Sequence, residues 1–157
     1  MGAVTPEQTS TVEARPRKTA YVAYVAAAAI LAVFTLIGTA LAGSTGEGPA
    51  VFRTGDQAAM IGLGICGALG ALAFARPRVR GTAEGIWVRN VFGTYDLPWS
   101  AVREVRFERG HPWVTLELAD DDTLSVLAIQ ATDKEYALQA VRGLRALHRS
   151  AMSDSRS

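Results

Sequence analysis

Two long uncharged apolar stretches dominate the first half of the chain. No charged residue occurs from Thr19 to Gly46, and residues 20–42 would span roughly 35 Å as a helix, more than the ~30 Å hydrocarbon core of a bilayer. A second uncharged run, 57–75, is about 19 residues long and also lies within the range of a spanning helix. The pattern therefore predicts two transmembrane helices, at about 20–42 and 57–75, that form a helical hairpin.

Basic residues gather on the two outer flanks of this pair. The connecting loop holds one arginine with two acids, whereas each outer flank holds three bases: Arg15, Arg17 and Lys18 before the first helix, and Arg76, Arg78 and Arg80 after the second. Because short cytoplasmic segments carry an excess of Lys and Arg, both termini are expected in the cytoplasm of a multi-pass cell-membrane protein. The ends themselves, residues 1–18 and 151–157, are expected to be disordered tails.

The first helix also has features of a signal peptide. A basic stretch precedes it, and Ala40-Leu41-Ala42 before Gly43 resembles a signal-peptidase site. Its apolar core of about twenty residues exceeds the usual 7 to 15, and a second span follows at once. We therefore expect the helix to be retained, although the sequence leaves cleavage after Ala42 open.

Small residues recur at spacings of three and four in the second span: Gly62, Gly64, Gly67 and Gly70, together with Ala59, Ala68 and Ala71. Such a surface lets two helix backbones approach closely. It predicts packing against the first span of the same chain, with self-association in the membrane as the alternative. The sequence does not decide the oligomeric state.

The second half of the chain changes to short alternating segments separated by turn residues, the pattern of half-buried antiparallel strands. Six strands are expected, at 79–82, 86–91, 94–97, 103–107, 113–118 and 123–127. A capping-box spacing from Thr132 to Glu135 then predicts the start of an amphipathic helix that ends near His148. Trp99, which follows Pro98 at a strand end, is expected to be buried in the core.

Composition excludes several kinds of chemistry. With 16 basic and 15 acidic residues, a polyanion such as nucleic acid is a poor partner. The single Cys66 lies in an apolar run, and neither His111 nor His148 has a nucleophile or acid at a catalytic spacing. The acidic run 120–122 lacks the alternating ligands of a calcium loop. We expect no enzyme, no cofactor and no metal.

Three pieces of sequence carry a resemblance to a known family: Gly85-Ile86-Trp87-Val88-Arg89, the step Leu97-Pro98-Trp99-Ser100, and Arg106-Phe107 with Arg109-Gly110. Over about residues 76–150 the chain resembles the bacterial PH domains of small actinobacterial membrane proteins, the group named for low molecular weight protein antigen 6. The resemblance implies an α+β fold, a PH-like antiparallel β-barrel or split barrel with one C-terminal capping helix. A turn glycine often found in the family is replaced by Asp122.

The expected function is that of a membrane-anchored binding or scaffold module on the cytoplasmic face. It would recognise a protein partner or its own copies, with Arg89, Arg103 and Arg106 as the candidate partner surface. The alternative is a sensor of anionic lipid, with Arg76, Arg78 and Arg80 as candidate headgroup contacts. Between Gly81 and Ser150 there are eight basic and ten acidic residues, and the first hairpin holds only an acid. Phosphoinositides are therefore not an expected ligand.

Overall fold

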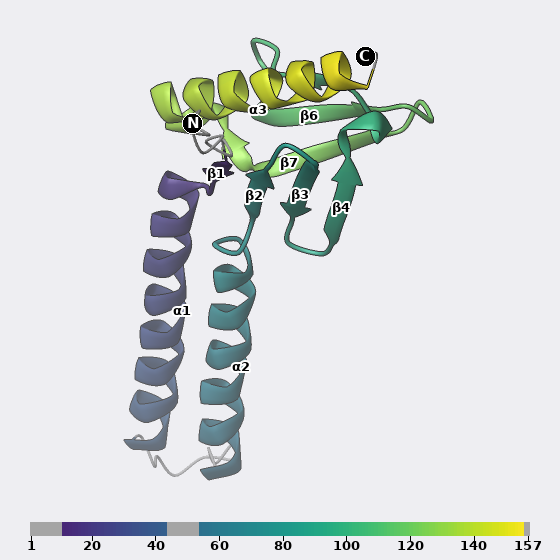
Figure 1. The fold of residues 1–157 in the computed structure, drawn as a ribbon. Helices are drawn as coiled ribbons and strands as arrows, with labels where there is room; N and C mark the ends of the chain where they lie inside the picture. The colour runs from purple at the N-terminus through teal and green to yellow at the C-terminus, as the bar shows by residue number, and fades with distance from the viewer. Residues whose placement is uncertain (1–10, 44–53, 156–157) are drawn as a thin grey trace, which may run out of the picture. The chain divides into compact units, whose positions relative to one another are not determined.

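The computed structural model describes residues 11–43 and 54–155 of the chain (Figure 1). The chain divides into two compact units. One contains Lys18–Arg76, and the other combines the stretches that flank it on both sides.

The first unit is a pair of helices, α1 (Arg17–Gly43) and α2 (Thr54–Ala73), which lie side by side (Figure 1). Only 11% of the most apolar window of α1 and 6% of that of α2 is buried, so most of their apolar surface is exposed. Both are long and apolar enough to cross a membrane. The expected positions agree with the structure to within three residues at each end.

The small-residue surface expected on α2 divides into two faces. A Cβ atom on Gly64 would lie 2.7 Å from Cβ of Phe34, and one on Gly67 would lie 3.0 Å from Ile30. These two glycines therefore let α1 and α2 approach closely. Gly62 and Gly70 have no atom within 4 Å of such a position, so they face away from α1. Self-association through this second face stays a prediction.

The second unit contains two antiparallel sheets. The first has the order β1 (Val12–Ala14), β2 (Arg78–Gly81), β3 (Gly85–Arg89) and β4 (Thr94–Pro98). The second has the order β5 (Val102–Arg106), β6 (Trp113–Leu118) and β7 (Thr123–Gln130). The six expected strands are all present. Among the described strands the ladders form two sheets, the split arrangement, and do not close into one barrel.

Helix α3 (Glu135–Asp154) covers the core, as Figure 1 shows in yellow. One cluster of buried side chains joins both sheets to the helix, and α3 contributes Ala137, Ala140, Val141, Leu144 and Leu147. Trp99, in the short 3-10 turn Trp99–Ala101, is 2% exposed, and its Nε1–H donates to the carbonyl of Thr82 at 2.8 Å. The expected burial of this ring is confirmed.

The expectation of a disordered tail at 1–18 is wrong for the residues that the structure describes. Strand β1 pairs with β2, Ala14 opposite Val79, and Ala14 is fully buried. Val12 packs so close to Gly143 on α3 that an added Cβ would lie 2.6 Å from it. Three residues are too short for a period to be recognised, and only the long-range pairing orders them. Residues 1–10 lie outside the described part.

The expected start and end of the last helix are also corrected. Ala131–Asp133 form a 3-10 turn, Lys134 has a φ of 43°, and no side chain caps α3. Thr132 therefore lies too early for the capping box. At the other end the helix continues to Asp154 because Ala151 and Met152 still pack against the core, so the expected tail at 151–157 is ordered to that point. Residues 156–157 lie outside the described part.

The β6–β7 hairpin turns without the expected glycine. Asp121 occupies the left-handed region with a φ of 67°, which aspartate adopts more readily than most side chains. Its carboxylate forms an ion pair with Arg103 at 2.6 Å. The missing glycine is thus compensated one position before Asp122.

Candidate functional site

A groove with a strongly basic lining runs between β5 and α3. Its volume is about 420 Å³, and its lining residues are Arg103, Glu104 and Val105 from β5 with Arg142, Arg145, His148 and Arg149 from α3. We call it the basic groove. The three helix arginines recur at spacings of three and four, which places them on one face of α3.

Two side chains of α3 fix the floor of the basic groove. Arg145 donates from Nε to the carbonyl of Val105 at 2.9 Å, and Nε2 of His148 lies 2.7 Å from the carbonyl of Val102. A carbonyl only accepts, so Nε2 of His148 carries a proton. The His148 ring also contacts Trp99, with ring centroids 5.5 Å apart. The helix thereby covers the open edge of β5, which would otherwise invite another strand.

The charge of the groove is largely uncompensated. Among the described residues no ion pair involves Arg142, and Arg145 and Arg149 each bond a backbone carbonyl, not a carboxylate. Arg103 is the exception, because Asp121 pairs with it. Glu104 is the only acid among the described residues of the lining. A net positive groove therefore lies on a domain that is net negative between residues 81 and 150.

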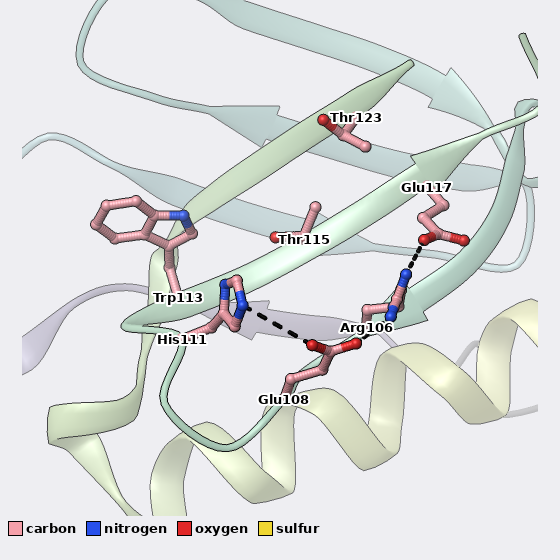
Figure 2. A pocket seen from close by; sticks show the side chains of 7 residues that line it. All are labelled: Arg106, Glu108, His111, Trp113, Thr115, Glu117 and Thr123. Carbon is pink, nitrogen blue, oxygen red and sulfur yellow. Dashed lines mark hydrogen bonds and ion pairs between the residues drawn. The ribbon is translucent and has the colours of Figure 1, made fainter. Parts of the chain in front are cut away.

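Arg106, on β5, lines a different and smaller pocket of about 150 Å³. Figure 2 shows its guanidinium between the carboxylates of Glu117 and Glu108, with His111 at 3.8 Å from Glu108 and Trp113 at the far end. The hydrogen bond that Arg106 donates to Glu117, followed by the one that it donates to Glu108, raises the pKa of Arg106 above its ordinary value. The charge of this arginine is thus already offset by two acids.

The turn between β2 and β3 borders a third pocket, of about 460 Å³. Its lining includes Arg80, which is 3.6 Å from the carboxylate of Glu13, together with Glu84 and Asp96. A hydrogen bond from Thr82, then one from its own backbone, lowers the pKa of Glu84, so this exposed carboxyl is charged at neutral pH. An acidic lining of this kind disfavours a phosphate.

The structure separates the residues expected to form one partner surface. Arg103 lies in the basic groove and Arg106 in the small pocket, while Arg89 lies on β3 in the other sheet. Of the candidate lipid contacts, Arg78 and Arg80 lie on the same face of β2, and Arg76 lies between α2 and β2. The sequence signal for the basic groove was the arginine spacing on α3, but the partner strand could not be read from it.

The described residues offer no assembled metal site. No group of three or more His, Cys, Asp or Glu side chains is placed there to hold an ion. Asp120 and Asp122 instead accept hydrogen bonds from backbone N–H groups of their own turn.

Comparison with known proteins identifies relatives of this chain. Residues 76–147 match the family described as Bacterial PH domain. Uncharacterized proteins of Mycobacterium bovis and of two strains of Mycobacterium tuberculosis are each 43% identical over 133 residues, covering 85% of this chain and 85% of the relative. The similarity is longer than the PH match and therefore extends beyond the domain. No solved structure matches.

Proposed function

Because the chain belongs to the same family as these mycobacterial proteins and carries a bacterial PH domain, we propose that it is a membrane-anchored binding module whose basic groove takes an acidic segment of a protein partner. PH domains are typically binding or scaffold modules and not enzymes. Membership of the narrower group named for low molecular weight protein antigen 6 is part of the proposal.

The anchor is the helical hairpin, with both of its ends on one side of the membrane. Strand β1 ends just before α1, β2 begins just after α2, and the two strands pair residue by residue. Paired strands occupy one compartment, so the chain between them crosses the membrane an even number of times. The basic flanks assign that compartment to the cytoplasm.

The concentration of arginine in the basic groove is the observation that supports the proposal. Arg142, Arg145 and Arg149 present their charge in a concave slot, and the slot also contains Glu104. A flat membrane surface cannot follow a concave slot, whereas a short acidic segment can enter it. Arginine binds carboxylates and phosphates alike in a bidentate manner, so the preference for a protein segment rests on the concave shape of the slot.

Affinity purification of the full chain from its own membrane, followed by mass spectrometry, tests this function. The variant combines Arg142→Glu with Arg149→Glu, which reverses the groove while sparing the bond from Arg145 to Val105. The control combines Arg109→Glu with Lys134→Glu, an equal change in charge at exposed positions outside the groove.

A partner that is retained by the control and lost by the groove variant is the expected result. The same partner should be displaced by a peptide of eight glutamates and not by one of eight glutamines. Equal retention by both variants would contradict the proposal. Loss of co-purified anionic lipid alone would favour the alternative, an anionic-lipid sensor.

A further inference from the structure

The hairpin between β3 and β4 presents an apolar side chain to solvent at its tip. Phe92 is 98% exposed, and Tyr95 nearby is 44% exposed. The turn is closed by a hydrogen bond from the Asn90 N–H to the Gly93 carbonyl at 2.8 Å. At this exposure the ring of Phe92 contributes nothing to the core, and it is free to contact a surface outside the domain.

Hydrogen bonds from one side chain fix the tip of this hairpin to the other sheet. The side chain of Asn90 donates from Nδ2 to the Ser125 carbonyl at 2.7 Å and accepts from the Leu127 N–H at 3.2 Å. Both partners lie on β7, in the other sheet. Asn90 therefore fixes the hairpin across the two sheets, and Phe92 is presented outward on a supported turn.

Two arginines lie directly opposite each other beside this tip. Arg78 on β2 and Arg89 on β3 are cross-strand partners, and Arg89 in turn is opposite Thr94. Among the described residues neither arginine forms an ion pair, since the acid Glu13 is engaged by Arg80. Like charges directly opposite in a sheet are destabilising, and an anion between them would relieve the repulsion.

The strand register places the tip at the end of the sheet from which the chain enters both helices. Two residues separate Ala14 of β1 from α1, and four separate the end of α2 from Arg78. Four residues reach at most roughly 14 Å even when fully extended. Since Arg78 is opposite Arg89 and the 90–93 turn follows at once, Phe92 belongs to this tethered end.

We propose that the β3–β4 hairpin docks onto the lipid bilayer that holds the two helices. Phe92 enters the interfacial layer, where aromatic rings are favoured, and Arg78 and Arg89 bind phosphate groups of anionic lipids. This docking uses the β1–β4 sheet, whereas the basic groove is formed by β5 of the second sheet together with α3. It goes beyond the proposed function because it fixes the orientation of the domain on the membrane.

A fluorescent label that lipid-borne nitroxides quench measures this contact in the full chain in nanodiscs. Cys66 is first replaced by Ala so that one new cysteine carries the label. The test position is Thr94, beside the tip, which leaves Phe92 intact. The control is Ala83, an exposed position in the β2–β3 turn at the opposite end of the same sheet.

Nitroxide lipids should quench the label at Thr94 strongly and the label at Ala83 weakly. Phe92→Asp, or Arg78→Glu together with Arg89→Glu, should lower the quenching at Thr94 toward the level at Ala83. Phosphatidylglycerol should increase it relative to phosphatidylcholine. Equal quenching at the two positions, or quenching at Thr94 that neither Phe92→Asp nor the arginine changes alter, would overturn the docking.

Discussion

Replacing Trp99 measures how far one side chain holds the two sheets and α3 together. The ring is 2% exposed and lies against His148, and its Nε1–H is bonded to the Thr82 carbonyl. Truncating a buried tryptophan to alanine costs about 3–5 kcal/mol. Trp99→Phe keeps most of the ring but loses the hydrogen bond, so it should cost less, about 1–2 kcal/mol.

Hydrogen exchange of the full chain in nanodiscs, followed in peptides that cover β3, reports these losses. At 1.4 kcal/mol for each tenfold change, Trp99→Ala should speed exchange roughly a hundred- to several-thousand-fold. Trp113→Ala is the control, since that ring is 37% exposed and should cost about 1 kcal/mol or less. A loss below about 1 kcal/mol for Trp99→Ala would refute the reasoning, because it would show that the ring does not support the core.

Three further outcomes are expected. A periplasm-active reporter inserted in the 43–56 loop should be active and one fused after Ser157 silent, and the reverse activities would overturn the orientation. Gly64→Leu should destabilise the helix pair, because its side chain meets α1, whereas Gly70→Leu should be tolerated; equal thermal stability in nanodiscs would contradict this packing. Soluble inositol phosphates should leave the NMR signals of the 82–85 turn unshifted, because Glu84 is charged there, and saturable shifts at physiological salt would promote the lipid-sensor alternative.

Local patterns were sufficient for most of the fold. The alternation in β6 predicted both its position and its buried face, because one side of the sheet packs on the core. In β5 a bulge breaks the alternation, so that Val102 and Val105 are buried three residues apart. The two uncharged runs predicted α1 and α2, because length and apolarity are local properties of the sequence. The capping box failed because Thr132 and Glu135 matched a spacing, while in the structure Thr132 lies in a 3-10 turn and Glu135 is the first residue of α3.

The candidate sites depended on pairing that no local pattern contains. Arg103 and Arg106 are three residues apart on one strand, yet each lines a different pocket and pairs with different acids. The basic groove requires α3 to lie along β5. The pair Arg78 and Arg89 requires the register of β2 against β3. The charged residues can be identified in the sequence, but which of them are neighbours depends on the fold.

Strand β1 bears on whether the first helix is cleaved, an alternative that the sequence left open. Cleavage after Ala42 would remove β1 from the mature chain, which would expose Val79 along the new sheet edge and empty the site of Val12 against Gly143. Both Ala14 and Val79 are fully buried, so the domain would lose part of its core. We therefore expect the mature protein to retain residues 12–14, and its intact mass, measured on protein extracted from the membrane, checks this directly. A mass that matches a chain starting at Gly43 would show that the domain tolerates an open β2 edge. It would also mean that β1 does not hold both ends of the hairpin on one side of the membrane.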